Sequence, residues 1–354
     1  MDMVVNVLRN RGRWRAPLAV AGLAFAVGAI ASLGVHAVPG GAILGGATLG
    51  TVQRCAAYSG LPAGWGKSRT AGMARVTGGE FVPGTTLGYP DERPAGKARV
   101  GSFWIDRTEV TVAQFAAFVQ ATGYVTDAER QGAAVVFHKP TDAELGQRPY
   151  AWWTMVTGAN WRHPEGPDAA NPHGYDHRRD NQPVTLVTQA DARAYANWLG
   201  HDLPAEDEWE FAAKAGRSDA GLETAPQTAE GTPTANYWQG VFPVLNTSRD
   251  GFAGLAPVGC YTANALGLFD MIANAWEWTG DAYTGPRQSH ANGDTAVVAA
   301  ASRPRKPAAT SVIKGGSFLC APDFCVRYRA SARESAESDL PTSHIGFRTV
   351  LRDG

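Results

Sequence analysis

The sequence predicts an α+β fold that is irregular and rich in loops. Its 41 glycines and 22 prolines require many turns and interrupted elements, while 11 tryptophans and 44% apolar residues can furnish a substantial core. Helical patterns fall in the first two thirds of the chain, whereas residues 221–354 carry only short apolar runs between Gly, Pro, Asn and Asp. This order of elements favours an α+β body over alternating βαβ units.

The first predicted elements are two short strands and one helix. Residues 73–81 alternate between apolar and polar before a turn, and residues 103–106 form a second strand pattern. Thr111 and Gln114 have the spacing of a capping box, with apolar residues behind them on one face. Gly123 is the expected end of this helix.

Two further helices are expected in the middle of the chain. Thr188 caps a segment with apolar residues at i,i+4 spacing, which ends before Gly200. Pro204 opens the next helix, acidic residues occupy its first turn, and Gly216 closes it. No internal repeat of fixed period is present.

The N-terminus, residues 1–37, has the pattern of a signal peptide or a signal anchor. Four arginines precede an uncharged, weakly hydrophobic run from Ala16 to Val35. Small residues before Val38 suit cleavage, whereas the length of the run equally suits an uncleaved membrane anchor. By the positive-inside rule, both alternatives place the rest of the chain outside the cytoplasm. We therefore expect an exported protein, periplasmic or membrane-anchored.

The remaining sequence divides into a lead-in and one domain. Residues 38–72 are rich in Gly and Ala and are expected to form a linker or lead-in, followed by a single domain over 73–354. The formal net charge is −1 and charges of both signs are intermixed. No broad basic surface is expected, which disfavours nucleic acid as a partner.

Four cysteines suggest several alternative roles. Cys55 and Cys260 stand alone, whereas Cys320 and Cys325 form a C-x4-C pair in a Gly-rich context. The close pair is compatible with a structural disulfide, with a redox dithiol, or with a soft low-coordinate ion such as Cu(I). Zinc is disfavoured because no second close cysteine pair or spaced Cys/His set accompanies it. Arg327 would favour a thiolate if it also lies nearby in space.

Several segments resemble, in the same order, those of formylglycine-generating enzymes of the sulfatase-modifying factor family. They are Gly-Ala-Asn-Trp-Arg-His-Pro-Glu-Gly (158–166), Leu-Pro-Ala-Glu-Asp-Glu-Trp-Glu-Phe-Ala (203–212), Asn-Ala-Trp-Glu-Trp (274–278), Lys-Gly-Gly-Ser-Phe-Leu-Cys (314–320) and Gly-Phe-Arg (346–348). The resemblance covers roughly Met73 to Arg352. Trp-Glu-Trp and Gly-Phe-Arg mark the broad superfamily, while the cysteine pair and Trp-Arg-His-Pro-Glu-Gly narrow it to the copper oxidases.

The resemblance implies an irregular α+β fold, distantly related to C-type lectin domains, and an oxidase activity. The implied substrate is a Cys-x-Pro-x-Arg segment of an unfolded or nascent sulfatase, whose cysteine becomes formylglycine and thereby activates the sulfatase. Cys320 and Cys325 would hold Cu(I) through soft sulfur ligands, with O2 and a thiol reductant as co-reactants. Ser317 matches the family's active-site serine, although a turn serine is the alternative.

The resemblance also implies residues that contact the substrate. Trp276 matches a tryptophan beside the active site, and Arg333 matches an arginine that contacts the peptide, with a structural ion pair as the alternative. His344 stands where the family often has a substrate-contacting asparagine. Phe324 replaces a tyrosine before the second cysteine, so the role of that hydroxyl is lost while aromatic packing can remain.

Two calcium sites and one disulfide complete the resemblance. The implied ligands are Asn236, Tyr237, Asp250 and Phe252 for the first site, and Asp270, Ala273, Ala275 and Glu277 for the second. The donors are side-chain oxygens of the Asn, Asp and Glu residues together with backbone carbonyls, and such hard oxygen ligands suit calcium. The alternative is that these polar residues cap turns. Cys55 with Cys260 would supply a disulfide, because Ala330 replaces a cysteine that is bridged in some relatives.

Two other functions belong to the same superfamily. An iron enzyme that forms carbon–sulfur bonds would need histidine ligands and usually an added helical bundle, which the sequence does not indicate. A non-catalytic peptide- or glycan-binding module would keep the fold and hold Cys320 and Cys325 as a plain disulfide. Dependence on copper separates this module from the oxidase.

Overall fold

The computed structural model describes residues 49–94, 96–147, 149–167, 177–216, 226–287 and 309–353. The chain divides into two compact units, 1–44 and 45–354, and all described residues belong to the second. The expected signal peptide or anchor, residues 1–37, lies outside the described residues. Within the described ranges, no helix has the length and apolar character needed to cross a membrane.

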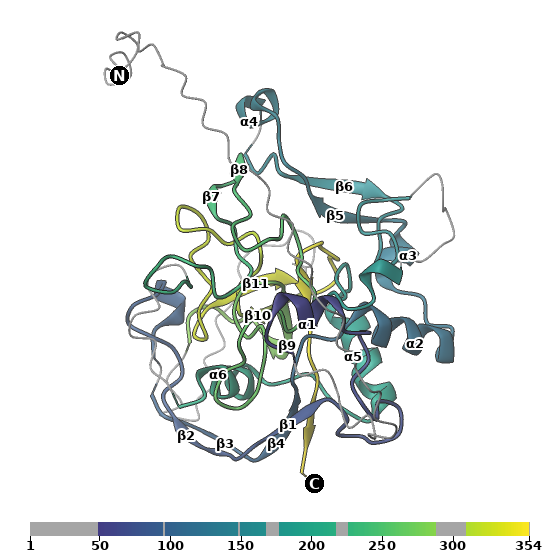
Figure 1. The fold of residues 1–354 in the computed structure, drawn as a ribbon, viewed down its shortest axis with the longest axis vertical. Helices are drawn as coiled ribbons and strands as arrows, with labels where there is room; N and C mark the ends of the chain where they lie inside the picture. The colour runs from purple at the N-terminus through teal and green to yellow at the C-terminus, as the bar shows by residue number, and fades with distance from the viewer. Residues whose placement is uncertain are drawn as a thin grey trace, which may run out of the picture. The chain divides into compact units, whose positions relative to one another are not determined.

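Short helices and small sheets are set among long loops (Figure 1), so the predicted loop-rich α+β fold is confirmed. The helices are α1 (Val52–Ala56), α2 (Val112–Thr122), α3 (Asp127–Gln131), α4 (Asp142–Gln147), α5 (Gln189–Leu199) and α6 (Glu206–Lys214), with 3-10 turns η1 (Pro90–Glu92) and η2 (His177–Arg179). Thr111 and Thr188 form capping boxes at α2 and α5, and both helices end at a left-handed glycine, as the sequence predicts.

Helix α6 departs from its prediction at both ends. It begins at Glu206 after Ala205, because Glu208 accepts a hydrogen bond from the Ala205 amide at 2.8 Å and supplies half of a capping box. Pro204 therefore lies before the helix and does not open it. At the other end Ala215, with φ of 47°, takes the left-handed position expected for Gly216.

The largest sheet has four strands in the order β11-β10-β9-β12. They are β9 (Trp276–Ala282), β10 (Thr310–Lys314), β11 (Arg333–Glu337) and β12 (Ile345–Gly346). Strands β9, β10 and β11 pair antiparallel, and β12 pairs parallel with β9. Lys314 lies opposite Glu277 on one side and opposite Arg333 on the other. This sheet comes entirely from the C-terminal part of the chain, and β11 is an edge strand.

A second sheet, β1-β4-β13, joins the start of the described domain to its C-terminus (Figure 1). Its strands are β1 (Met73–Val76), β4 (Phe103–Asp106) and β13 (Val350–Arg352); two-stranded pairs are β2 (Gly79–Phe81) with β3 (Ala98–Val100), β5 (Ala133–Phe137) with β6 (Trp153–Thr157), and β7 (Gly240–Val241) with β8 (Leu245–Asn246). The strands predicted over residues 73–81 and 103–106 are present as β1, β2 and β4.

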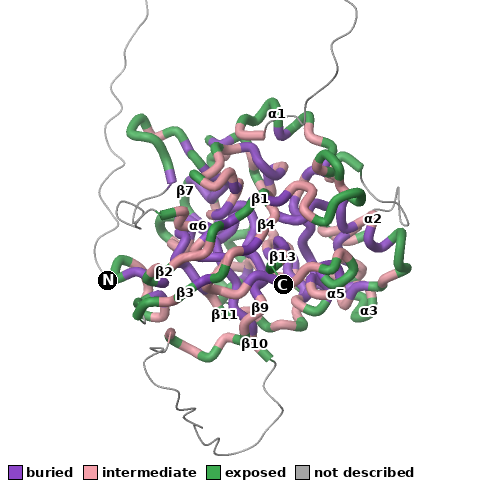
Figure 2. The backbone as a smooth tube through the Cα atoms, turned by 90° about the horizontal axis from the view of Figure 1, so that it is seen from below, coloured by how far each residue is buried: buried purple, intermediate pink, exposed green. Residues whose placement is uncertain are grey.

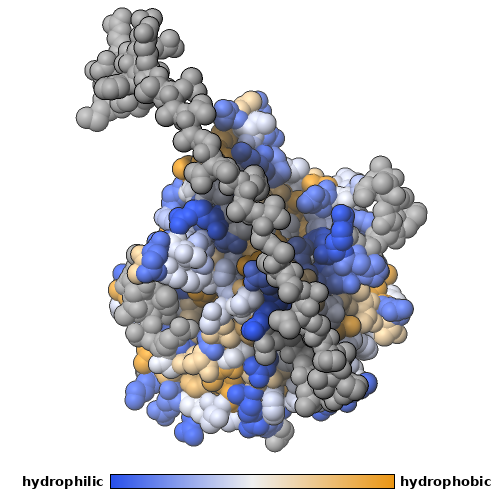
Figure 3. All heavy atoms as spheres, viewed as in Figure 1, coloured by the Kyte–Doolittle hydropathy of each residue, from blue (hydrophilic) through white to orange (hydrophobic). Residues whose placement is uncertain are grey.

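The core consists of two main apolar clusters, and buried residues concentrate in the middle of the described unit (Figure 2). The larger cluster packs α2 and α5 against β9 and β12 around Phe115, whose ring centroid lies 5.3 Å from that of Trp161. The second cluster packs α6 against β1, β4 and β13 around Trp209. On the described surface visible in Figure 3, hydrophobic patches are interspersed with hydrophilic residues.

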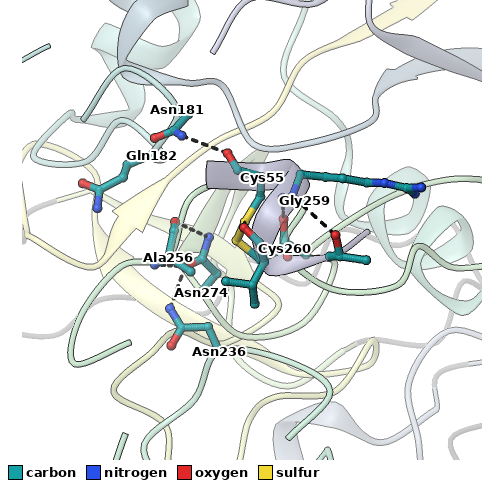
Figure 4. The surroundings of a disulfide bond; sticks show 12 residues. Cys55, Asn181, Gln182, Asn236, Ala256, Gly259, Cys260 and Asn274 are labelled. Atoms are coloured by element: carbon teal, nitrogen blue, oxygen red, sulfur yellow. Dashed lines mark hydrogen bonds between the residues drawn. A yellow bond between two sulfur atoms is a disulfide. The ribbon is translucent and has the colours of Figure 1, made fainter. Parts of the chain in front are cut away.

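Residues 49–72, the described part of the expected linker or lead-in, lie against the rest of the unit. Cys55 on α1 is buried and forms a disulfide with Cys260 (Figure 4). The Asn181 side chain donates to the Cys55 carbonyl at 2.9 Å, and the Thr111 hydroxyl donates to the Gly60 carbonyl at 2.6 Å. This part of the lead-in is therefore fastened to the domain covalently and by buried hydrogen bonds.

Candidate active site

A tight turn after β10 carries the cysteine pair. Gly315 and Gly316 follow Lys314 with φ of 95° and 82°, values that favour glycine. A Cβ atom at Gly316 would lie only 2.8 Å from the Arg327 carbonyl oxygen. The two glycines therefore let the chain pass close to the segment that follows the second cysteine.

The turn brings the two predicted thiols together. Ala321 and Phe324 exchange backbone hydrogen bonds of 2.7 and 3.2 Å, which folds the chain back between the cysteines. The Sγ atoms of Cys320 and Cys325 lie 2.8 Å apart, and both cysteines are free. Cys320 is fully buried, whereas Cys325 is partly exposed and has a left-handed backbone with φ of 54°.

The two thiols differ in acidity. Burial opposes ionisation of Cys320, but the hydrogen bond from Cys325 and the backbone groups of Ser317 and Arg327 lower its pKa, helped by the Arg327 charge. The pKa of Cys325 is raised well above its usual range, first by its hydrogen bond to Cys320 and then by burial. The pair therefore favours a thiolate on Cys320 and a proton on Cys325.

Cys325 lies at the wall of a cavity of about 540 Å³, a volume in the range of ligand sites. The aromatic lining residues are Tyr89, Tyr150, Trp152, Trp153, Phe242, Trp276 and Phe324; the others are Ile313, Ser317, Leu319, Cys325, Arg327, Glu334, Ser335, Ala336, Glu337, Leu340, Thr342, His344 and Ile345. The cavity thus combines a large aromatic surface with a few polar and charged groups. Cys320 is not among its lining residues and lies behind Cys325.

Ser317 and Trp276 line the same cavity as Cys325. Ser317 is fully buried, its carbonyl accepts from the Cys320 amide at 3.0 Å, and its hydroxyl oxygen accepts from the Leu319 amide at 3.3 Å. Trp276 is 2% exposed and begins β9. The structure therefore brings both predicted residues to the wall that carries the thiol.

His344 also lines the cavity, with its ring centroid 4.7 Å from that of Trp153. Its carbonyl accepts a hydrogen bond from the Trp276 amide at 2.9 Å, which connects it to β9. Burial lowers the pKa of His344 to about 3, so the ring is neutral near pH 7. Its Nδ1 atom is buried and has no hydrogen-bond partner among the described residues.

Arg333 does not line the cavity. It is 3% exposed, and its Nε atom donates to Glu206 at 2.9 Å while Nη1 donates to the Gly285 carbonyl at 2.7 Å. The structure thus places Arg333 in a buried ion pair, the alternative to the predicted substrate contact. Arg327 faces the cavity instead, 4.1 Å above the Tyr89 ring.

The aromatic lining comes largely from residues that the sequence pattern did not single out. Trp152 and Trp153 lie at the start of β6, and the run Tyr-Ala-Trp-Trp at 150–153 was the available signal. Phe324 stacks on Phe242 with centroids 4.3 Å apart and planes 5° from parallel. Aromatic packing is therefore retained at the position where the family has a tyrosine.

The residues predicted for the first calcium site have oxygens that converge. The Gln239 side-chain amide donates both to the Tyr237 carbonyl and to Asp250 Oδ2, the latter at 2.6 Å. Asn236 lies beside them, with its amide nitrogen bound to the Gly254 carbonyl at 2.9 Å (Figure 4). Two predicted ligand oxygens thus already meet at one point, which fits an oxygen-coordinated cation.

The second predicted calcium site contains excess buried negative charge. Glu277 accepts two hydrogen bonds of 2.7 Å from Arg348, and Asp270 accepts from the Gly259 amide at 2.5 Å. Burial raises the pKa of Asp270 to about 6, and burial with Asp270 and Glu277 nearby raises that of Glu109 well above its usual range. Three carboxylates thus share one arginine, an imbalance that a divalent cation would relieve.

The backbone of this second site also has an unusual conformation. Asp270, Ala273 and Asn274 have φ of 52°, 64° and 55°, a region that side chains other than glycine seldom adopt. Ala273 stands where the resemblance has glycine, which this positive φ explains. Across the described ranges, no group of three or more His, Cys, Asp or Glu residues is arranged to hold a metal ion.

The fold and the dithiol at the cavity wall define the class of protein as an enzyme that works through a cysteine pair. The chain belongs to the sulfatase-modifying factor family, because residues 59–353 match the model of the sulfatase-modifying factor enzyme 1-like domain. The family predicted from the sequence is therefore confirmed.

Two relatives and one solved structure support this assignment. The chain is 42% identical to the formylglycine-generating enzyme of Thermomonospora curvata over 78% of this chain and 92% of that protein. It is 40% identical to the formylglycine-generating enzyme of Mycobacterium tuberculosis over 78% of this chain and 97% of that protein. The structure of PvdO from Pseudomonas aeruginosa has a TM-score of 0.53 at 22% identity, covering 79% of this chain and 94% of that one, which shows a shared fold.

Proposed function

We propose that this protein converts a cysteine of a sulfatase into formylglycine and thereby activates the sulfatase. The observation that carries the proposal is the free thiol pair, 2.8 Å apart, with Cys325 at the wall of the cavity. Relatives about 40% identical over most of the chain are formylglycine-generating enzymes, which supports the same activity here. The proposed target is a Cys-x-Pro-x-Arg segment of an unfolded or nascent sulfatase.

Cu(I) is the proposed cofactor at the cysteine pair. Two sulfurs side by side, one of them predisposed to be a thiolate, form the soft donor set that this ion prefers. When bound, copper would supply the activation of O2. Cys320 would hold the ion from the buried side, and Cys325 would hold it from the side that faces the substrate cavity.

The reaction balances with a thiol reductant as the source of two electrons and two protons. The substrate cysteine loses one hydrogen from Cβ, and its carbon–sulfur bond breaks with release of hydrogen sulfide. One atom of O2 becomes the aldehyde oxygen and the other becomes water. Ser317, buried beside Cys320, is proposed to donate a hydrogen bond to the oxygen species or to a water.

The substrate peptide is proposed to lie in the cavity against Trp276 and His344. Their side chains line the same wall as Cys325, and the neutral His344 ring can donate or accept one hydrogen bond at Nδ1. The aromatic lining would exclude water from the reacting thiol. The buried ion pair of Arg333 with Glu206 supports a role in positioning β11 and not a contact with peptide.

Calcium and an oxidising compartment complete the proposal. The converging oxygens at Tyr237 and Asp250, and the excess carboxylates around Asp270, support two calcium sites that stabilise the native fold. The disulfide between Cys55 and Cys260 supports a location outside the cytoplasm, exported or membrane-anchored.

One experiment tests the proposed activity. The Cu(I)-loaded protein is incubated with O2, a reductant and a Cys-x-Pro-x-Arg peptide, and mass spectrometry follows the conversion of thiol to aldehyde. We expect conversion by the native chain and none by Cys325→Ser. A native chain that binds the peptide and forms no aldehyde would favour the non-catalytic binding module. Equal conversion by Cys325→Ser would refute the thiol pair as the catalytic centre.

A further inference from the structure

One side of the cavity carries a net negative charge. Residues 334–337 of the edge strand β11 line it and include Glu334 and Glu337. Arg327 is the one cationic side chain among the lining residues, and His344 is neutral near pH 7. One positive and two negative charges leave −1 at the cavity wall. A cationic group inside the cavity would thus experience an attractive field.

Arg327 does not neutralise this wall, because it is already shared among several carboxylates. It lies 3.2 Å from Asp91 and 3.0 Å from Glu334, and it also contacts Glu92. The pKa of Glu334 is raised, first by burial and then by Asp91 and Glu92, despite the opposing charge of Arg327. The carboxylate of Glu334 therefore remains short of positive charge in its surroundings.

Glu337 is the more accessible of the two glutamates. Its side chain is exposed, and it has no ion pair with any residue that the structure describes. Its neighbour across the β10–β11 pair is the uncharged Thr310. The carboxylate of Glu337 is thus available to a ligand without the loss of an existing interaction.

A separate observation indicates that this cavity receives a polar ligand. Thr342 lines the cavity and is 9% exposed, yet its hydroxyl has no hydrogen-bond partner within the described ranges. His344 Nδ1, two residues further on, is also without a partner. Buried polar atoms are normally hydrogen-bonded, so two such atoms at one cavity point to a ligand with backbone-like donors and acceptors.

The polar segment is held firmly in place. The Thr342 carbonyl accepts from the Leu186 amide at 3.1 Å, and the Ser343 amide donates to the Val135 carbonyl at 3.0 Å. The unpartnered atoms therefore belong to a backbone that is fixed from two sides, as a preorganised binding wall requires.

We infer that Glu337, with Glu334 beside it, forms a subsite for a cationic side chain of the substrate segment. The inference rests on the proposed function and assigns a specificity-determining role to β11. A guanidinium group suits two carboxylates because it can donate several hydrogen bonds in a fixed plane. The peptide backbone would meet Thr342 and His344, while its arginine or lysine side chain would meet the glutamates.

The test uses Glu337→Gln, which removes the charge at nearly constant size. Glu80→Gln is the matched control, because Glu80 is exposed on β2 and does not line the cavity. Binding of Ser-x-Pro-x-Arg and Ser-x-Pro-x-Gln peptides, which cannot be oxidised at a thiol, is followed by tryptophan fluorescence. Trp152, Trp153 and Trp276 line the cavity and report on its occupancy.

We expect Glu337→Gln to weaken the Arg peptide about three- to tenfold, because the lost pair is only partly shielded from solvent. It should leave the Gln peptide within about twofold, and the difference should shrink as salt increases. Glu80→Gln should affect neither peptide. The thermal midpoint of Glu337→Gln should match that of the native chain, since the side chain is exposed and unpaired.

Equal losses for both peptides, or no loss for either, would overturn the subsite. Absence of binding of either peptide to the native chain would overturn it as well. The proposed activity is judged separately by aldehyde formation on the corresponding Cys peptide. Discrimination between the Arg and Gln peptides without aldehyde formation would keep the subsite and refute the oxidase.

Discussion

The two cysteine pairs of this protein differ in spacing, bonding and surroundings. Cys55 and Cys260 are separated by 205 positions and form a disulfide in an apolar cluster. Cys320 and Cys325 are five residues apart, remain free, and lie where a cavity reaches one of the two sulfurs. The distant pair connects two parts of the chain, whereas the close pair connects nothing that the turn does not already hold together.

This difference shows why a short spacing alone does not identify a stabilising bridge. The loop between Cys320 and Cys325 is already closed by the backbone hydrogen bonds of Ala321 and Phe324, so a bond there would restrict few additional conformations. A bond across 205 positions restricts the unfolded chain far more. Stability and reactivity are thus assigned to different cysteines, and each assignment can be tested alone.

The largest expected effect is on activity. Cys325→Ser should lower the rate of aldehyde formation by more than about 100-fold, since even the loss of a group behind a metal ligand costs 10- to 100-fold. Cys320→Ser should have a similar effect. Both variants should keep a thermal midpoint close to that of the native chain, measured by circular dichroism. A large loss of stability in either would show that the close pair is structural after all.

The next effect concerns the buried charges beneath the active-site turn. Glu210 lies 3.0 Å from Lys314, just before Gly315, and also pairs with Arg287. Glu210→Gln should lower the free energy of unfolding by about 3–5 kcal/mol, because it leaves buried cations without their partner. Denaturant unfolding at pH 7 measures this loss, and a value below that of Glu80→Gln would contradict it.

The same variant has a defined dependence on pH. Although burial opposes ionisation, Lys314, Arg287 and Lys214 together lower the pKa of Glu210 to about 2. A carboxylate with a lowered pKa stabilises the fold above its unfolded pKa of roughly 4.3, and this contribution is lost as the pH falls towards 2. The stability gap between the native chain and Glu210→Gln should therefore narrow between about pH 4.5 and pH 2.

The disulfide should affect stability and leave catalysis intact. Replacement of both Cys55 and Cys260 by Ala should lower the free energy of unfolding by about 2–4 kcal/mol. The specific rate at 25 °C should stay within about twofold of the native chain, because the bridge lies outside the cavity lining. A pronounced loss of activity in a fully folded double variant would show that the two cysteine pairs are coupled.

Chelation of calcium should have the smallest effect in this series. At free calcium ten- to a hundredfold above its dissociation constant, the ion stabilises a fold by about 1.4–2.7 kcal/mol, and a chelator should remove this contribution. Asp250→Asn should diminish the response, because it removes one of the converging oxygen charges. An unchanged thermal midpoint after chelation would refute the proposed calcium sites.

Much of the local structure was predictable from the sequence because its signals are local. The capping boxes at Thr111 and Thr188 involve residues three positions apart, and both helices form as predicted. By contrast, the ion pair of Arg333 with Glu206 joins residues 127 positions apart. No local pattern distinguishes that pairing from exposure to a substrate.

The cavity was only partly predictable for the same reason. Cys325, Ser317, Trp276 and His344 were found through matched segments, and the structure gathers all four at one wall. The aromatic residues of the β5–β6 hairpin and the glutamates of β11 reach the cavity only through tertiary packing. Burial or exposure in the folded chain, and not residue type, decides which acidic side chains face a ligand.

The order of the cysteines along the chain has a consequence for biosynthesis. Cys55 and Cys260 both precede Cys320, and the whole four-stranded sheet follows Cys260. During synthesis into an oxidising compartment, the bridge can close while the last two cysteines are still within or near the ribosome. By the time those thiols emerge, the two earlier cysteines are no longer available to mispair with them. Vectorial translation thus protects the reactive pair from its own oxidising environment.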